Sequence, residues 1–294
     1  MVLRALVFSG AALGSCQAVA TTACTSNSTT DCAAPTEFHL SVASGAGFRS
    51  NPLFGGHNFP LWLMADVHYY DDAFFFDNGT LGYTLPFDAA VTVSLVSRIN
   101  DEVSYFRRAR ATDFFEYQLI SDKGLLGPVE RYQIKTELSI DDVAKRPWAL
   151  DAGVQLDMFG QAWHTSLNWW HDVNGAYDGS HVKVAGQYQW QTSYGDFSIG
   201  SALHWKSRQL IDTYYGISAA EWNDEALQGK ASLQPEVSLQ WHKELTERWS
   251  VMSLIRYRWI DLKVEDESGA TLQSPLQQDN HVRSIFLGLS YRFI

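Results

Sequence analysis

Beyond its first twenty residues, the chain has no long hydrophobic run. A transmembrane helix needs roughly 18 or more consecutive apolar residues, and the mean hydropathy of -0.18 agrees that none is present. A membrane-spanning helix is therefore excluded. Any membrane signal in this chain must be carried by strands.

The chain is also poor in basic residues. Its 33 Asp and Glu outnumber its 22 Lys and Arg, which gives a formal net charge of -11 at pH 7. Removing Arg4 with a signal peptide leaves 21 basic residues and a charge of -12. Binding to a phosphate backbone relies on clustered basic residues. The sequence therefore predicts no nucleic-acid partner.

Residues 1–20 have the features of a secretory signal peptide. Arg4 precedes a short apolar run, and Ala18-Val19-Ala20 has the small-x-small pattern of a cleavage site. An alternative interpretation takes Leu13-Gly14-Ser15-Cys16 as a lipoprotein box, which would acylate Cys16. Both interpretations predict an exported protein.

Cysteine is scarce, with three in the whole chain. Cys24 and Cys32 remain after Cys16, and both lie in a Thr- and Ser-rich stretch without a hydrophobic period. We interpret residues 21–36 as a flexible periplasmic leader. In an oxidising compartment the two cysteines either form a local disulfide or stay free thiols, and neither alternative makes them catalytic.

Aromatic residues, in contrast, are abundant: they make up 14% of the chain, with 11 Trp and 13 Tyr. Trp and Tyr are favoured at the two lipid–water boundaries of a membrane. Residues 283–293 alternate without a break, and one phase is apolar: Ile285, Leu287, Leu289, Tyr291 and Phe293. This pattern predicts an amphipathic strand that ends on an aromatic residue, as in bacterial outer-membrane barrels.

The same alternation recurs along the chain. It is found in the segments 37–48, 61–70, 72–84, 87–98, 128–140, 147–158, 162–172, 181–191, 196–206, 228–242, 248–261 and 283–293. The fold class predicted is all-β: a transmembrane antiparallel up-and-down β-barrel of about 12 strands, with 10 or 14 as alternatives, over residues 37–294. Pro235 predicts a local distortion, because proline cannot donate to a strand ladder.

The connections between the predicted strands alternate between long and short, as expected when short turns face the periplasm and long loops face outward. The segment 99–127 is long, yet this count places it on the periplasmic side. Because it carries Arg107, Arg108 and Arg110 and a predicted short helix, we interpret it as a periplasmic contact element. The alternative is an extra pair of strands with a shifted count.

The polar phase of the predicted strands carries charges of both signs. The residues predicted to face the lumen are Arg131, Lys135, Glu137, Asp151, Asp157, Lys183, Glu236, Arg256 and Arg258. Mixed charges allow two outcomes: paired charges close and rigidify the barrel, or opposed arrays leave a hydrated constriction that passes small solutes.

Three sequence features are candidate sites of chemistry. Residues 170–175 resemble the His-x-Ser stretch of outer-membrane phospholipase, but Val173 stands where a nucleophile is needed, and Ser166 or Ser180 would have to approach His171. The histidines show no metal-ligand spacing. The acidic loop 264–268 either binds divalent cations that bridge lipopolysaccharide or is simply solvated. We predict no catalytic residue, cofactor or metal.

Several motifs carry a family resemblance. They are Pro52-Leu53-Phe54-Gly55-Gly56, Phe59-Pro60-Leu61, Gly79-Thr80-Leu81-Gly82-Tyr83, Thr213-Tyr214-Tyr215-Gly216-Ile217-Ser218, Trp249-Ser250-Val251, Ser274-Pro275-Leu276 and Gly288-Leu289-Ser290-Tyr291-Arg292-Phe293. In order and spacing the chain resembles the MipA/OmpV family of outer-membrane proteins from about residue 38 to the end. The family usually has Asp before the Ser-Pro pair, where this chain has Gln273, and ends on the aromatic, whereas here Ile294 follows.

The resemblance implies a non-enzymatic barrel in the outer membrane of a Gram-negative cell. It also implies a scaffold that brings a murein transglycosylase together with a murein synthase, or else a porin-like channel or an adhesin. Outer-membrane lipid and lipopolysaccharide are the expected surroundings. Fold transfers between relatives more safely than function does.

Overall fold

A computed structural model describes residues 38–71, 73–88, 90–106, 137–222 and 225–293 of the 294-residue chain. The elements in chain order are β1 (Phe38–Arg49), β2 (Phe59–Pro60), β3 (Leu63–Tyr70), β4 (Phe74–Asp77), β5 (Thr80–Asp88), β6 (Val91–Ile99), the 3-10 helix η1 (Glu102–Phe106), β7 (Leu150–Phe159), β8 (Trp163–Asp172), β9 (Ser180–Thr192), β10 (Gly195–Lys206), α2 (Arg208–Tyr215), β11 (Gln228–Gly229), β12 (Ser232–Glu244), β13 (Trp249–Trp259), β14 (Lys263–Glu265), β15 (Thr271–Gln273) and β16 (His281–Arg292). Within these ranges, no helix has the length and apolar character needed to cross a membrane.

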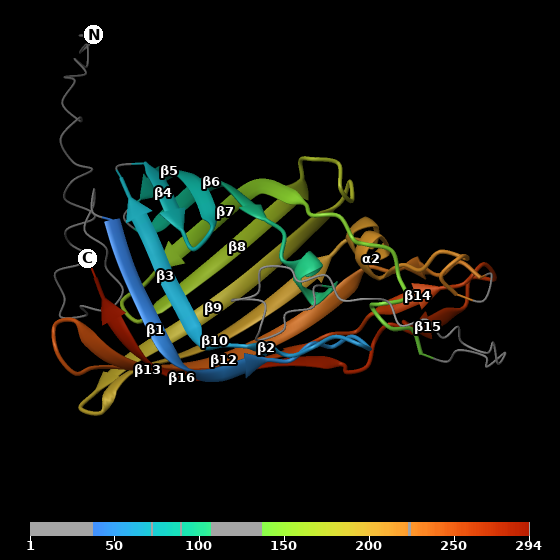
Figure 1. The fold of residues 1–294 in the computed structure, drawn as a ribbon. Coiled ribbons are helices and arrows are strands. Elements are labelled where there is room, and N and C mark those ends of the chain that lie inside the picture. The colour runs from blue at the N-terminus through green and yellow to red at the C-terminus, as the bar shows by residue number, and fades with distance from the viewer. Residues whose placement is uncertain (1–37, 72, 89, 107–136, 223–224, 294) are drawn as a thin grey trace, which may run out of the picture.

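The strands form one closed antiparallel barrel (Figure 1). Twelve strands make the wall, in the order β16-β13-β12-β10-β9-β8-β7-β6-β5-β4-β3-β1, and β1 pairs with β16 to close it. This closing ladder runs from Ser41 opposite Arg292 to Arg49 opposite Ser284. Gly45 allows the two strands to approach, because a Cβ there would lie 2.1 Å from the carbonyl oxygen of Leu287. The predicted fold class and strand number are confirmed.

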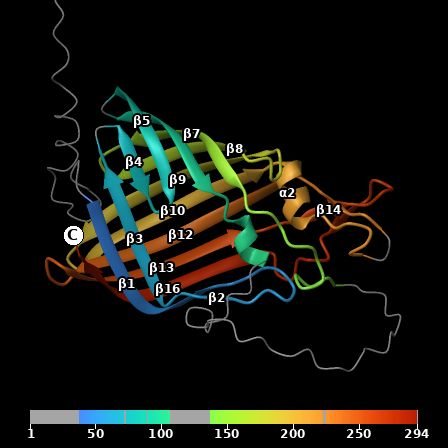
Figure 2. The same ribbon diagram turned by 45° about the horizontal axis from the view of Figure 1, so that its top comes forward.

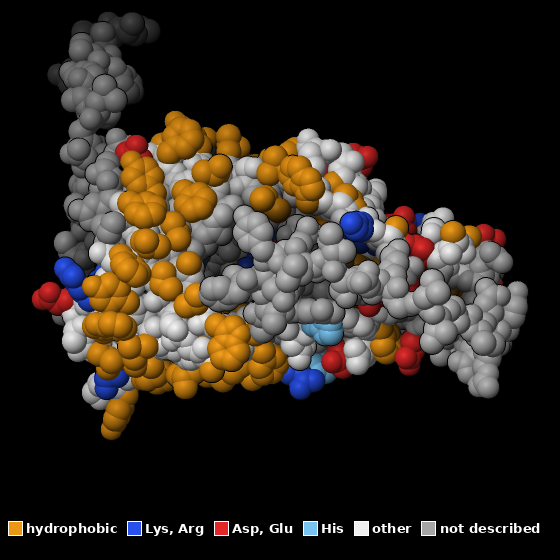
Figure 3. Space-filling view, in the orientation of Figure 1, with side chains coloured by type: hydrophobic (Ala, Val, Ile, Leu, Met, Phe, Trp, Pro, Cys, Tyr) orange, Lys and Arg blue, Asp and Glu red, His pale blue; other side chains and the backbone are white. Residues whose placement is uncertain are grey.

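Apolar side chains cover the outside of the barrel wall. Leu287, Val154, Ile199 and Leu239 all belong to the apolar phase of their strands and are exposed. Figure 3 shows hydrophobic side chains over the strand region of the visible face, whereas acidic side chains gather on the loops at one end. This segregation matches a barrel whose wall faces lipid.

The two ends of the barrel differ in the length of their connections. The short turns 160–162, 193–194 and 245–248 lie at the same end as residues 38 and 293 (Figure 1). The long connections 50–62, 100–149, 173–179, 207–231 and 260–280 lie at the other end. Outer-membrane barrels keep short turns in the periplasm, so we call these the periplasmic end and the outer end.

The segment 72–84 was predicted as one strand, and this is wrong. It contains two short strands, β4 and β5, joined by a tight turn at Asn78 and Gly79. Both residues have positive φ, at 45° and 90°. Asn-Gly is the strongest short-range signal for such a hairpin, so the sequence did contain the information.

No wall strand lies between β6 and β7, where the strand 128–140 was predicted. β6 pairs directly with β7, from Val91 opposite Met158 to Ile99 opposite Leu150. Residues 137–140 contain no strand, and 128–136 lie outside the described residues. Because β4 and β5 replace one predicted strand, the wall still has twelve strands without a strand at 128–140.

The predicted periplasmic position of segment 99–127 is wrong for its described part. Residues 100–106 follow the outer end of β6, and residues 137–149 lead into the outer end of β7. Arg107, Arg108 and Arg110 lie outside the described residues. So do the signal peptide and the leader with Cys24 and Cys32, which stay predictions.

The distortion predicted at Pro235 is absent from the pairing of β12 with β10. That ladder runs past Pro235, which lies opposite Leu203, without a register shift. The pairing with β13 ends one residue away, at Glu236 opposite Arg258. Proline is therefore accommodated where only one neighbour continues.

We expect neighbouring substitutions on β12 to have opposite consequences. Leu239→Arg would place a charge in lipid and should destabilise the barrel by about 2–4 kcal/mol. Gln240→Arg points into the lumen and should change the free energy of unfolding by less than about 0.5 kcal/mol. Urea unfolding from lipid vesicles measures both. Equal costs at the two positions would contradict the outward position of Leu239.

Candidate functional site in the barrel lumen

The long connections pack together at the outer end of the barrel into what we call the outer cap. Its apolar core consists of Leu53, Tyr105, Leu138, Ile140, Ala149, Tyr177, Leu210, Ile211, Tyr214, Tyr215, Ile217, Leu227, Ile260, Leu262, Val264 and Leu276, with Val282 of β16. All of these side chains are buried. Burial of each large apolar side chain contributes roughly 1.5–3 kcal/mol. The outer cap is therefore a packed structure.

The helix α2 supplies the centre of this core. Ser207 caps its first turn by accepting a hydrogen bond from the Leu210 backbone N–H. Leu210, Ile211, Tyr214 and Tyr215 recur at helical spacing and are all buried. This helix contains the beginning of the Thr213–Ser218 motif, so a motif that carries the family resemblance forms part of the cap core.

An arginine ties two connections of the cap together. The Arg146 guanidinium donates to the carbonyl oxygens of Tyr214, at 3.0 Å, and Gly216, at 2.8 Å. It also lies 3.6 Å from a carboxylate oxygen of Glu221. Burial raises the pKa of Glu221, but hydrogen bonds from the Ala144 and Ser218 backbone N–H groups outweigh it, so the pKa is lowered. Glu221 therefore stays ionised beside Arg146.

The 3-10 helix η1 and the residues before it continue from β6 into the outer end of the lumen (Figure 2), where Tyr105 joins the cap core. Tyr105 accepts a hydrogen bond of 2.5 Å from Arg49 on β1, and Asn100 donates one of 2.7 Å to Asp151 on β7. Glu102 pairs with Lys206 on β10. At least two other strands separate any two of these three strands around the barrel. A segment held at three such points occupies the outer end of the lumen.

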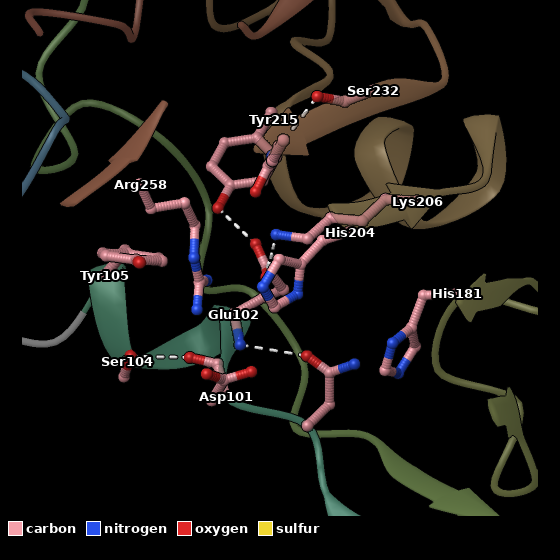
Figure 4. A network of polar contacts seen from close by, with 12 residues as sticks. Asp101, Glu102, Ser104, Tyr105, His181, His204, Lys206, Tyr215, Ser232 and Arg258 are labelled. Atoms are coloured by element: carbon pink, nitrogen blue, oxygen red, sulfur yellow. Dashed lines mark hydrogen bonds and ion pairs between the residues drawn. The ribbon is translucent and has the colours of Figure 1, made fainter. Parts of the chain in front are cut away.

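Glu102 is the most enclosed charge in this crossing. Its side chain is 3% exposed and that of Lys206 is 6% exposed. Its second carboxylate oxygen accepts a hydrogen bond from the Tyr215 hydroxyl, as Figure 4 shows. Burial, followed by the negative charge of Glu102, raises the pKa of Tyr215 well above its ordinary value. Tyr215 therefore stays protonated and continues to donate.

Asp151 joins η1 to a second outer loop. Its carboxylate accepts hydrogen bonds from Asn100, from the Tyr177 hydroxyl at 2.6 Å and from His181 at 2.8 Å. Asp151 is fully buried. Buried carboxylates are stable only with such partners. Asp151 thus faces the lumen as predicted, but its carboxylate contacts protein side chains instead of open water.

Glu236 holds a second cluster of charges. It accepts a hydrogen bond of 2.7 Å from Arg258, and Arg256 and His204 each lie 3.5 Å away. These residues come from the neighbouring strands β10, β12 and β13. The charges therefore pair between neighbouring strands along one wall, and the two outcomes considered for the mixed interior stay predictions.

The remaining predicted lumenal residues have different surroundings. Asp157 is buried and lies 2.9 Å from His164. Lys183 is half-buried on β9 opposite His204. Glu137 is exposed and lies in no strand, so its predicted place in a barrel strand is wrong. Arg131 and Lys135 lie outside the described residues.

The lumen opens toward the periplasmic end. On β12 the inward residues Ser232, Gln234 and Glu236 are buried, whereas Gln240, nearer the periplasm, is exposed. A cavity of about 790 Å³ lies there between β1, β3, β9, β10, β12, β13 and β16. We call this cavity the vestibule. It has the size of a typical ligand pocket.

His171, which faces outward from β8, is within hydrogen-bond distance of Ser180. Its Nδ1 lies 3.0 Å from Ser180 Oγ, across the β8–β9 pair. Ser166, the other serine considered, is buried in the opposite phase of β8. Among the described residues no carboxylate or amide is hydrogen-bonded to the other ring nitrogen, whereas a nucleophilic triad needs that third group.

The other two candidate sites of chemistry are the histidines, as metal ligands, and the acidic loop 264–268. In the described ranges, no three His, Cys, Asp or Glu side chains are grouped so that they could hold a metal ion. The Asp266 carboxylate accepts hydrogen bonds from the Ser268 and Ala270 backbone N–H groups and the Ser268 hydroxyl. The acidic loop thus forms a tight turn.

The residues of η1, and the asparagine that precedes it, are not identified by the sequence analysis. Asn100, Glu102 and Tyr105 follow a predicted strand but have no periodic pattern of their own. Their partners, Lys206 among them, are brought near only by barrel closure. No local sequence signal identifies them.

We expect Glu102→Ala to destabilise the barrel by about 3–5 kcal/mol, because it leaves Lys206 buried without a partner. Glu265→Ala is the matched control: its partner Lys230 lies 3.2 Å away on the surface, and the loss should stay below about 1 kcal/mol. Urea unfolding of the refolded protein checks both. A Glu102→Ala cost as small as the control would show that η1 is not anchored in the lumen.

The chain was compared with known proteins. An anion-selective porin from Comamonas acidovorans is similar at 8% identity and a TM-score of 0.33, over 87% of this chain and 100% of that one. An outer membrane channel from Pseudomonas putida F1 is similar at 9% identity and a TM-score of 0.34, over 89% and 97%. A search of curated proteins found no match. The family model of MltA-interacting protein MipA matches residues 44–293. This outer-membrane barrel therefore belongs to the MipA family.

Proposed function

We propose that this barrel is a non-enzymatic scaffold that holds a murein transglycosylase, and with it a murein synthase, at the outer membrane. The family description, MltA-interacting protein, names such a partner. The resemblance of the motifs supports the same role. A scaffold needs a surface facing the periplasm, where murein lies, and requires no reactive groups.

The difference between the two ends of the lumen is the observation that carries this proposal. The outer end is filled by the outer cap and η1, whereas the vestibule opens to the periplasm. A passage for solutes would have to cross the packed outer end. A barrel whose lumen is closed at the outer end and open at the periplasmic end is better suited to contacts on its periplasmic side.

The contact surface proposed here is the set of periplasmic turns. Tyr194 and Leu245 lie in the turns 193–194 and 245–248 and are 74% and 53% exposed. Aromatic side chains are enriched at protein interfaces, and these two residues define the surface that the proposal tests. The sequence favours the segment of Arg107, Arg108 and Arg110 as the contact element, but the described residues on both sides of it lie at the outer end.

The wall and the outer cap have other expected contacts. The outward apolar phase would contact outer-membrane lipid, and the outer rim would contact lipopolysaccharide. The exposed Trp169, Trp205 and Trp259 lie near the outer ends of their strands. Tryptophan favours that boundary, which supports this arrangement.

A passive pore is the second candidate function. The amide and hydroxyl side chains of the vestibule favour it, because a hydrated polar lumen suits small solutes. It would require η1 to leave the lumen. The contacts of Glu102, Asn100 and Tyr105 hold η1 in place.

Co-purification tests the scaffold. The intact protein, solubilised from membranes, should retain a murein transglycosylase, and the double variant Tyr194→Ser, Leu245→Ser should retain at least about fivefold less, a loss of roughly 1 kcal/mol. Leu272→Ser, 46% exposed in the outer cap, is the control and should retain as much as the intact protein. Absence of a murein enzyme from the intact protein, or equal loss in the control, would count against the proposal.

Planar bilayers test the pore. We expect no stepwise conductance from the intact refolded protein, because η1 occupies the outer end of the lumen. Glu102→Ala should produce brief openings if the weakened crossing leaves its place at times. Steady conductance of the intact protein would favour the pore and contradict the closed lumen described above.

A further inference from the structure

The vestibule has walls that can hydrogen-bond in both directions. Gln187, Gln189 and Gln240 line it, together with Ser41, Ser198, Ser250 and Ser290. Amides and hydroxyls both donate and accept, so these walls match a ligand that also carries donors and acceptors. A peptide backbone has one of each per residue.

Two residues of opposite charge lie on either side of Ser41 at the mouth of the vestibule. Ser41 on β1 lies opposite Asp66 on β3 and opposite Arg292 on β16. The three line the cavity. Neighbouring strands are about 4.8 Å apart, so the backbones of Asp66 and Arg292 are separated by roughly 10 Å. Two or three extended peptide residues span that distance, at roughly 3.3–3.6 Å each.

Arg292 keeps most of its donors for a ligand. Its guanidinium lies 3.7 Å from a carboxylate oxygen of Glu244, and both side chains are well exposed. A guanidinium has five N–H donors, and it binds a carboxylate through two parallel hydrogen bonds. Arg248 also lines the cavity and donates to the Tyr291 hydroxyl at 3.3 Å. This side of the mouth therefore favours a carboxylate.

The inner end of the vestibule is apolar. Ala43, Met64 and Met252 line it and pack with the buried Leu254 and Phe286. This end would accept a small apolar side chain, and methionine adapts to irregular shapes. Together, the walls, the mouth and the inner end match the three kinds of group that a short peptide carries.

A sugar ligand fits less well. Saccharide sites usually offer an aromatic face, but Trp190, Phe197 and Trp241 belong to the outward phase of their strands although their residues border the cavity. Trp190 and Phe197 stack on each other, with ring centroids 5.6 Å apart. These rings serve the membrane boundary.

We propose that the vestibule binds a short peptide with a free carboxylate and a free amine, the chemistry of the peptide stems of murein. Arg292 binds the carboxylate, Asp66 binds the amine, and the amide and serine walls bind the backbone. The choice of murein as the source rests on the proposed scaffold function. Bound stems would bring murein itself to the site where its enzymes are held.

Calorimetry on the refolded full chain in detergent tests this, with the murein stem tetrapeptide and trialanine as probes. We expect the tetrapeptide to bind with a dissociation constant below about 1 mM. Arg292→Gln should weaken binding at least tenfold, roughly the value of one charged contact. It should not weaken binding of the tetrapeptide amidated at its carboxylates, which already lacks that contact. Arg283→Gln, on the same strand but in its outward phase, is the control.

A second pair of variants tests the cavity independently of charge. Ser198→Trp would fill the vestibule and should abolish binding, whereas Ile199→Trp, its outward neighbour on β10, should leave binding unchanged. The gel shift of folded barrels verifies that both fold. Tighter binding of the tetrapeptide than of trialanine supports murein as the source, and equal binding supports a peptide from another source.

The proposal is overturned if neither probe binds at millimolar concentration, or if Arg292→Gln and Ser198→Trp bind like the intact protein. No murein enzyme is present in this assay, so its outcome is separate from that of co-purification. Peptide binding without a retained enzyme would contradict the scaffold proposal and support the vestibule site. A retained enzyme without peptide binding would support the scaffold and contradict the vestibule site.

Discussion

Backbone pairing in lipid is the constraint on which the rest of this structure depends. Every N–H and C=O group in the hydrocarbon must find a partner within the protein, so a sheet in the membrane has to close. Here the closure is made by β1 and β16, which are distant in the chain. Once closed, the period-two pattern of each strand separates one apolar surface from one polar lumen. The outer cap, the crossing of η1 and the vestibule all exist inside that frame.

Closure also explains why the lumenal charges are paired. A carboxylate inside a narrow barrel is removed from bulk water and is costly without a partner. Glu236 pairs with Arg258 on the neighbouring strand, and Glu102 of η1 pairs with Lys206 on β10 and with Tyr215 on α2. The pairing of Glu102 requires that a segment of the chain, η1, lies in the lumen. The polar interior that made a pore conceivable is therefore also what holds η1 at the outer end.

The sequence predicted the wall well, because a strand in lipid imposes its alternation on every residue. The positions of Leu239, Leu287 and Val154 followed from that pattern alone. It predicted the lumen less well, because Glu102 and Asn100 belong to no periodic segment and their partners are set by tertiary closure. The apolar period alone predicts one strand over 72–84, whereas the turn residues Asn78 and Gly79 indicate a hairpin there.

The asymmetry of the two ends has a functional consequence beyond occlusion. At the outer end, apolar side chains from five connections bury one another, so that surface is satisfied within the chain. At the periplasmic end the turns are too short to form a core, and Tyr194, Leu245 and the vestibule remain exposed to solvent. Exposed apolar and hydrogen-bonding surface is what a partner or ligand can use. In the proposed scaffold, this exposed surface lies on the side of the membrane where murein is found.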